Sequence, residues 1–204
     1  MGAEPVELVL FDLGGVLIEL GGVASMRELS GIESDDELWR RWLGCPWVRS
    51  YERGECSADE FAKGVIDDWG LTAEPAAFLA AFAAWPLGPY PGAEALVARV
   101  RRSVPVGCLS NTNAGHCDDH FSRWPIFDAF DFRFLSYELG LLKPDREIFD
   151  RVAELVDVPA GRILFLDDIQ LNVDGALDAG FAAARVRGVA EAERALIRTR
   201  VLPT

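Results

Sequence analysis

The sequence predicts an α/β protein, a doubly wound parallel sheet with a small all-helical insertion after the first strand. Short apolar runs alternate with amphipathic stretches from residue 93 to residue 201, which is the order that successive βαβ units produce. One further apolar run, Leu8–Phe11, lies far upstream, and residues 23–85 between the two parts carry helical patterns and no convincing strand. The first strand therefore belongs to the same sheet, and the helical segment interrupts one domain.

The first predicted strand delivers a carboxylate to its carboxyl end. The apolar residues Leu8–Phe11 precede Asp12, and a continuous apolar run is typical of a parallel strand buried on both faces. Gly14 and Gly15 follow and allow a tight backbone turn. The next apolar stretch, Val16–Leu20, predicts a short hairpin or flap.

Helix signals fill the inserted segment. Ser34 precedes Glu37, and Ser57 precedes Glu60, with the spacing of a capping box, while Pro46 suits the first turn of a helix. Five of the six tryptophans also fall here, at positions 39, 42, 47, 69 and 85. These signals predict a compact helical lid.

The expected domain boundaries follow from this insertion. We interpret residues 1–20 and 86–204 as a core and residues 21–85 as a helical cap. Pro86–Gly92 is rich in proline and glycine and is the predicted linker back to the core.

The alternating half of the chain supplies the rest of the sheet. Helices are predicted at Ala93–Arg102, Ala114–Arg123, Asp145–Val156, Leu171–Ala179 and Glu191–Val201. Strands are predicted at Val104–Leu109, Phe130–Leu135, Arg162–Leu166 and Ala182–Val186. Right-handed crossovers between such elements produce a parallel sheet with helices on both faces.

Charge and composition restrict the partners. The net charge of −13 opposes attraction to nucleic acid and to anionic membranes, because both are polyanions. The first apolar run is interrupted by acidic residues and follows no basic ones, so we expect neither a signal peptide nor a membrane span. A cytoplasmic protein with a small-molecule partner is the expectation, and the oligomeric state is left open.

The cysteines and histidines offer one competing metal site. The four cysteines form no CxxC pair and are expected to be reduced thiols. His116 and His120 have the i, i+4 spacing that zinc sites use. The sequence offers no evident third and fourth ligand, which argues against zinc.

Polar residues follow several predicted strands. Asp12 ends the first strand, the run Ser110–Asn113 ends the second, and Asp167 with Asp168 ends a later one, while Lys143 opens a helix. Each alone fits a helix cap or a solvated charge. Together, at the edge where α/β sheets bind ligands, they predict a nucleophile or metal site with a hydroxyl and a cation.

Four motifs resemble those of the haloacid dehalogenase-like superfamily, in the subfamily with a helical cap after the first motif and a Rossmann-like core. The motifs are FDLGGVL, LSNTN, GLLKPDREIF and LFLDDIQLN. The segments YERGECSADEF and LSYELGLLKP are further similar to bacterial sugar-phosphate phosphatases of the alpha-glucose-1-phosphate phosphatase type. The resemblance covers nearly the whole chain.

The resemblance implies a Mg²⁺-dependent phosphomonoester hydrolase acting on a small phosphorylated metabolite, with a sugar phosphate as the first candidate. Asp12 is the implied nucleophile, which forms an aspartyl-phosphate that water hydrolyses. The implied Mg²⁺ ligands are Asp12, the backbone carbonyl of Gly14, and Asp168, and hard oxygen ligands suit this ion.

The resemblance also implies roles around the nucleophile. Ser110 and the backbone amide of Asn111 bind a phosphoryl oxygen, and Lys143 pairs with the phosphate and the nucleophile. Asp167 and Asn172 orient Lys143 and the metal-bound waters. In the cap, Trp47, Tyr51, Glu52 and Arg53 are expected to set substrate specificity more than chemistry.

One departure from the family pattern keeps other functions open. Gly14 stands where the phosphatases carry an aspartate as general acid and base, and His116 is the candidate that supplies a proton instead. Dehalogenases of the superfamily also lack that acid and displace halide without a metal, although they usually carry a bulkier residue there. A 2-haloacid dehalogenase and a weakly active or non-catalytic binding protein are therefore the alternatives.

Overall fold

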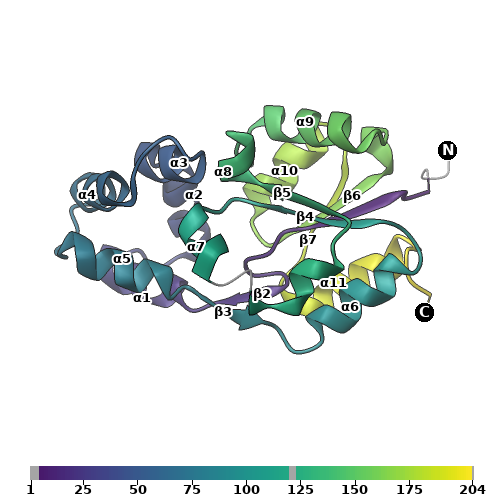
Figure 1. The fold of residues 1–204 in the computed structure, drawn as a ribbon, viewed down its shortest axis with the longest axis horizontal. Helices are drawn as coiled ribbons and strands as arrows, with labels where there is room; N and C mark the ends of the chain where they lie inside the picture. The colour runs from purple at the N-terminus through teal and green to yellow at the C-terminus, as the bar shows by residue number, and fades with distance from the viewer. Residues whose placement is uncertain (1–4, 120–122, 204) are drawn as a thin grey trace.

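The computed structural model describes residues 5–119 and 123–203, and its centre is a sheet of five parallel strands (Figure 1). The strands lie in the order β5-β4-β1-β6-β7, so that β1 is central. Their bounds are β1 Leu8–Phe11, β4 Val106–Ser110, β5 Phe132–Leu135, β6 Ile163–Asp167 and β7 Ala182–Arg185. The predicted doubly wound sheet is confirmed.

Helices cover both faces of this sheet because its strands are apolar on both sides. In β1, Leu8 and Leu10 pack toward the face covered by α9 and α10, while Val9 and Phe11 pack toward the face covered by α6 and α11. Burial of each such side chain contributes roughly 1.5–3 kcal/mol. The covering helices are α6 Ala93–Arg101, α9 Arg146–Val156, α10 Gln170–Asp178 and α11 Gly188–Arg198.

Five helices between β2 and β3 form a separate helical block at the carboxyl end of the sheet (Figure 1). They are α1 Gly22–Ser30, α2 Asp35–Gly44, α3 Pro46–Glu52, α4 Ala58–Trp69 and α5 Pro75–Ala83. Ser34 caps α2, and the Ser57–Glu60 capping box opens α4 as predicted. The block has its own apolar cluster, centred on Trp42, Phe61 and Phe82. The division of the chain into core and cap stays a prediction.

The predicted linker Pro86–Gly92 is wrong for its first half, which forms a strand. Strand β3, Pro86–Pro89, pairs antiparallel with β2, Ile18–Leu20. The predicted flap therefore pairs with a strand that follows the helical block in the sequence. At the same junction, the Gly21 amide donates a hydrogen bond of 2.8 Å to the Trp85 carbonyl. Proline is tolerated here because a two-stranded ribbon consists of edges only. The ribbon joins the entry and the exit of the helical block.

Short helices complete the described part of the chain. They are α7 Ala114–Asp119, η2 Pro125–Ala129, α8 Ser136–Leu139 and η3 Ala160–Arg162. The predicted helix Ala114–Arg123 is described only as far as Asp119, and His120 of the zinc hypothesis lies outside the described residues. The four cysteines are free thiols. Within residues 5–119 and 123–203, no helix has the length and apolarity needed to cross a lipid bilayer.

Candidate active site

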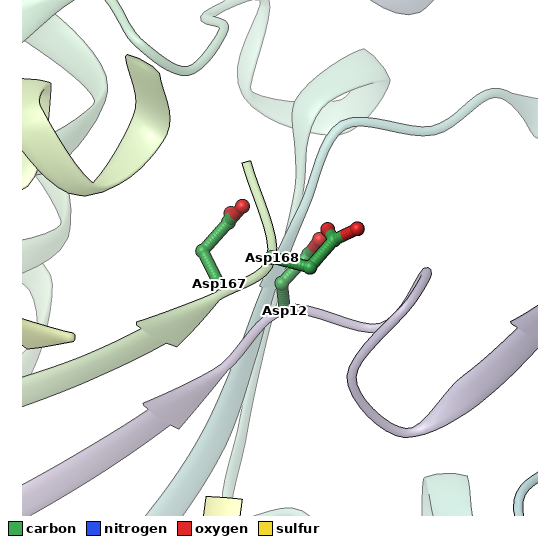
Figure 2. Close-up of side chains that lie close together, drawn as sticks. All are labelled: Asp12, Asp167 and Asp168. Atoms are coloured by element: carbon green, nitrogen blue, oxygen red, sulfur yellow. The ribbon is translucent and has the colours of Figure 1, made fainter. Parts of the chain in front are cut away.

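Three carboxylates meet beyond the ends of β1 and β6. Asp12 follows β1, Asp167 ends β6 and Asp168 comes next, and one oxygen from each lies within 4.8 Å of the others. Figure 2 shows the carboxylates of Asp12 and Asp168 side by side, with that of Asp167 standing apart from the pair. Parallel pairing of the two strands, with Phe11 opposite Leu166, causes this convergence. Asp12 and Asp168 thus form a pair of neighbouring carboxylates at the carboxyl edge of the sheet.

Lys143 forms ion pairs with both Asp12 and Asp167. Its Nζ lies 2.9 Å from Asp12 Oδ1 and 2.6 Å from Asp167 Oδ2, and its side chain is 1% exposed. Asn172 Nδ2 donates to both oxygens of Asp167, at 3.1 and 3.0 Å, and the Ile169 amide donates to Oδ1 at 2.8 Å. Asp167 is therefore held by three groups and holds Lys143 against Asp12.

The charges in this cluster depend on one another. Burial raises the pKa of Asp12 to about 7, and Lys143 opposes that rise. Burial together with the charges of Asp167 and Asp12 raises the pKa of Asp168 to about 8. Burial alone lowers the pKa of Lys143, but Asp12 and Asp167 outweigh it and raise the pKa above its ordinary range. A second cation beside Asp12 and Asp168 would lower the cost of holding these two carboxylates close together.

Ser110 and Asn111 lie where β4 ends, next to this cluster. Ser110 is buried and lines the same cavity as Asp12. The side chain of Asn111 makes two bonds to the backbone of Lys143: Nδ2 donates to the carbonyl at 2.9 Å, and Oδ1 accepts from the amide at 3.0 Å. This clamp on the lysine backbone was not predicted, because the sequence expectation concerned only the amide of Asn111.

The residues present fit a divalent cation. Asp12 and Asp168 offer carboxylate oxygens, and the Oδ1 of Asn172 is buried in the cavity without a hydrogen-bond donor in the described parts of the chain. Gly15 has φ +72°, and a Cβ there would lie 2.4 Å from Asp168 Oδ2, so the backbone must pass close to this acid. An all-oxygen donor set is what Mg²⁺ prefers.

A cavity of about 100 Å³ opens in front of these acids. Its sheet-edge wall consists of Asp12, Gly14, Ser110, Asn111, His116, Lys143, Asp168 and Asn172 with their neighbours. Its helical wall consists of Trp39, Trp42, Leu43, Glu52, Phe82 and Trp85, continued by Ile18, Leu20 and Pro86 of the ribbon. Glu52 is the one ionisable side chain of the helical wall among the described residues. The sequence pattern did not reveal that these aromatic rings face the site.

His116 lies in the cavity, and both of its ring nitrogens have partners. Nε2 is 2.9 Å from the carbonyl of Phe82 on α5 and therefore carries the proton. The His116 amide donates to Asn113 Oδ1 at 3.0 Å, so Asn113 presents its Nδ2 to Nδ1 of the ring at 3.2 Å. The predicted role of His116 toward substrate stays a prediction, and the contacts describe a neutral imidazole that joins α7 to the helical block.

Of the cap residues predicted to set specificity, Trp47, Tyr51 and Arg53 lie outside the cavity lining. Tyr51 stacks on Phe61, with ring centroids 4.4 Å apart, and Trp47 packs over Gly64, where a Cβ would meet its ring at 2.0 Å. Arg53 pairs with Asp145 at 2.9 Å. Their direct contact with substrate therefore stays a prediction without support from the cavity lining, whereas Glu52 between them does line the cavity.

The structure is thus a doubly wound α/β sheet with a buried lysine and an acid cluster at its carboxyl edge, where such sheets bind ligands. The profile of the haloacid dehalogenase-like hydrolase family matches residues 6–180, and the chain belongs to this family. The resemblance seen in the motifs is thereby confirmed.

Several relatives share most of their length with this chain. D-ribitol-5-phosphate phosphatase of Bacteroides thetaiotaomicron is 31% identical over 189 residues, covering 86% of this chain and 89% of the relative. (S)-2-haloacid dehalogenase H-109 of Pseudomonas putida is 24% identical, covering 87% and 84%. Among solved structures, a haloacid dehalogenase family enzyme of Bacteroides thetaiotaomicron in complex with magnesium and inorganic phosphate aligns with a TM-score of 0.68 at 24% identity, covering 89% and 94%. The last similarity is one of fold.

Proposed function

We propose that the protein is a phosphomonoester hydrolase that uses Asp12 as nucleophile and Mg²⁺ as cofactor. The observation that carries this proposal is the position of the Asp12 carboxylate, between the Lys143 ammonium at 2.9 Å and the carboxylate of Asp168. A carboxylate in that position can attack phosphorus. The Lys143 ammonium on one side, and a metal ion held by Asp168 on the other, would neutralise the phosphoryl oxygens.

Three groups of the chain would hold the metal: the carboxylates of Asp12 and Asp168 and the backbone carbonyl of Gly14. When bound, Mg²⁺ supplies a positive charge that reduces repulsion between the nucleophile and the phosphate dianion. The buried Oδ1 of Asn172 is an acceptor suited to a metal-bound water.

The remaining residues of the sheet-edge wall bind and orient the phosphoryl group. The Ser110 hydroxyl and the Asn111 amide donate to one phosphoryl oxygen, and Lys143 donates to another while it stays paired with Asp12. Asp167 and the Asn111 side chain fix Lys143 from its two ends, at its ammonium and its backbone. Nothing in this set has to reorganise when charge develops on the transferring group, which is the condition for electrostatic catalysis.

A small phosphorylated metabolite, and a sugar phosphate first, is the proposed substrate. The relative named for D-ribitol 5-phosphate supports this class, and the cavity of about 100 Å³ is small beside the 300–1,000 Å³ usual for drug-sized ligands. Tryptophan rings such as Trp42 and Trp85 can pack against the C–H face of a sugar. The helical block would act as a cap that closes over this substrate.

A dehalogenase is the second candidate, favoured by the relative named (S)-2-haloacid dehalogenase. The paired acids Asp12 and Asp168 support the phosphatase instead, because halide displacement needs no divalent cation to occupy them. A binding protein with little turnover remains the third alternative, since Gly14 provides no proton donor.

One screen separates these functions. Phosphate and halide release are measured over sugar phosphates, nucleotides, phospho-amino acids, flavin mononucleotide and 2-chloropropionate, with Mg²⁺ and with excess chelator. The proposal predicts phosphate release that requires Mg²⁺. Halide release that persists in chelator would make the protein a dehalogenase, and release of neither would leave a binding protein.

A further inference from the structure

The phosphatase needs a proton donor that its nucleophile loop does not contain. Gly14 has no side chain, and Leu20 of β2 lies over it, with Cδ1 2.8 Å from where a Cβ would stand. An alkoxide leaving group must nevertheless receive a proton as its bond to phosphorus breaks. The donor has to be another group that reaches the cavity.

Most acidic and basic groups that line the cavity, within the described residues, already have a proposed role or a hydrogen-bond partner. Asp12 is the nucleophile and Asp168 belongs to the proposed metal site. The proton of His116 lies on Nε2 and is directed at the Phe82 carbonyl, while Nδ1 accepts from Asn113. Glu52 is the remaining acidic side chain in the lining.

Glu52 is unusual because it is a buried carboxyl with few polar contacts. It is the last residue of α3 and is 7% exposed. Trp42 Nε1 donates to its Oε1 over a long 3.4 Å. A carboxylate in such surroundings is poorly stabilised, and burial raises the pKa of Glu52 to about 7. The side chain therefore carries a proton for much of the time at neutral pH and can release it.

The end of α3 is fixed against the sheet-edge wall. Arg49 and Arg53 both pair with Asp145, which follows Lys143 by two residues. The next turn also approaches closely, because a Cβ on Gly54 would lie 3.1 Å from the Tyr137 carbonyl. These contacts bring Glu52 near enough to Lys143 and Asp12 for their charges to act on its pKa.

We propose that Glu52 is the acid and base that replaces the missing aspartate. The inference rests on the proposed phosphatase function. An oxygen of Asp12 bonds to phosphorus, the bond from phosphorus to the leaving oxygen breaks, and the Glu52 carboxyl gives that oxygen its proton, which releases an alcohol. Glu52, now a carboxylate, then takes a proton from the water that attacks the aspartyl-phosphate. Phosphate leaves, and Asp12 and protonated Glu52 are regenerated.

The deciding variant is Glu52→Gln, which keeps an oxygen for Trp42 but cannot exchange a proton. D-ribitol 5-phosphate tests a primary alkoxide that needs an acid, and p-nitrophenyl phosphate tests a phenolate that leaves without one. With saturating Mg²⁺, kcat/KM, which reports formation of the aspartyl-phosphate, should fall on the order of 10²-fold or more for the alkyl substrate and only a few-fold for the aryl substrate. Because Glu52 is also the base in the hydrolysis of the aspartyl-phosphate, kcat for the aryl substrate should fall too, and p-nitrophenolate should appear as a burst. Glu55→Gln is the matched control, because Glu55 is exposed on the turn after α3, and it should leave both rates unchanged.

The pH profile of the unmodified protein provides a second measurement. Trp42, Arg49, Lys143 and Asp12 are the groups around Glu52 that act on its titration. Since the acid must be protonated in the first step, kcat/KM for the alkyl substrate should fall as the pH rises through about 7, and kcat/KM for the aryl substrate should not fall with it. This profile decides the matter even if Glu52→Gln proves not to fold by circular dichroism.

The outcomes that overturn the inference are distinct from failure of the proposed function. Equal losses of kcat/KM on both substrates, parallel pH profiles of kcat/KM, or a rise in KM alone would give Glu52 a structural or binding role. An unmodified protein that releases phosphate from neither substrate would instead refute the phosphatase. Adding Gly14→Asp with Leu20→Ala to the Glu52→Gln protein should restore alkyl turnover, because the aspartate then stands where relatives carry their acid.

Discussion

The two walls of the cavity differ in how firmly their polar groups are held. On the sheet-edge wall, Lys143, Asp167 and Asn172 form a buried network with bonds of 2.6–3.1 Å. On the helical wall, Glu52 lines the cavity together with several aromatic rings and accepts a hydrogen bond of 3.4 Å from Trp42. The first wall is rigid because the central strands position it, whereas the second is held by contacts between separate helices and the sheet.

This difference separates charge stabilisation from substrate contact. Groups that stabilise a transferring phosphoryl must be fixed in advance, and the sheet edge provides that. The helical wall is joined to the sheet by partly exposed ion pairs, from Arg49 and Arg53 to Asp145 and from Arg185 to Asp36. Such pairs are individually weak, so we expect the helical wall to move more readily than the sheet edge.

The largest expected effect comes from removing the nucleophile. Asp12→Asn should reduce phosphate release by more than about 10⁴-fold, because no other carboxylate stands in its position. Lys143 keeps Asp167 as a partner, so the fold should persist by circular dichroism. Asp59→Asn, an exposed position of α4, is the control. Substantial turnover in Asp12→Asn would remove Asp12 from the chemistry.

The second largest effect is expected from replacing Lys143, which pairs with both Asp12 and Asp167. Lys143→Met conserves length but leaves Asp12 and Asp167 buried without their cation, which should cost about 3–5 kcal/mol of unfolding free energy at neutral pH. The loss should shrink toward acid pH, where Asp12 becomes protonated and no longer needs the ammonium. Urea unfolding at several pH values measures it. A loss that does not vary with pH would mean that packing, not charge, accounts for the effect.

The sequence predicted the sheet-edge wall well because strand periodicity and position at a strand end determine it. Asp12 and Asp168 had to meet once β1 and β6 were adjacent and parallel. The clamp from Asn111 to the Lys143 backbone could not be foreseen, since it depends on how the loop before α9 folds against β4.

The helical wall was predicted as a set of helices but not as a surface. Capping signals located α2 and α4, yet the direction in which Trp42, Glu52 and Arg53 point depends on packing between helices that are distant in sequence. Arg53 pairs with Asp145, a contact that the sequence did not predict, and its role toward substrate stays a prediction. The strand at Pro86–Pro89 was missed for a similar reason, because its partner lies on the far side of the helical block.

Metal binding should depend on pH through the paired acids of the sheet edge. The pKa values of these acids, about 7 for Asp12 and about 8 for Asp168, exceed the ordinary 3.8. Between about pH 4 and pH 8 the folded protein therefore binds more protons than the unfolded chain. Stability without metal should therefore fall as the pH rises from about 4 to 8. Because Mg²⁺ must displace those protons, its apparent affinity should rise on the order of 10³-fold between pH 6 and pH 8.5.

Thermal unfolding with and without Mg²⁺ measures this linkage. At pH 8.5 and a hundredfold excess over Kd, the midpoint should rise by about 5–10 °C, and at pH 6 the same Mg²⁺ concentration should raise it far less. Asp168→Asn should abolish the difference between the two pH values. A Mg²⁺ shift that is equal at both pH values would show that the ion binds elsewhere.

The smallest expected effect tests what holds the helical wall in place. Arg53 and Asp145 are each more than a quarter exposed, so Arg53→Ala should cost no more than about 1 kcal/mol of stability. If Arg53 acts by fixing the end of α3, its loss should raise KM a few-fold and lower alkyl turnover by displacing Glu52. Asp145→Ala also removes the partner of Arg49, so it should produce at least that change, and adding Arg53→Ala to it should change little more. If Arg53 instead touches the substrate, its removal should still raise KM in the Asp145→Ala background and should change the order of preference among sugar phosphates. The double-mutant cycle on kcat/KM therefore separates a contact made through Asp145 from one made to the substrate.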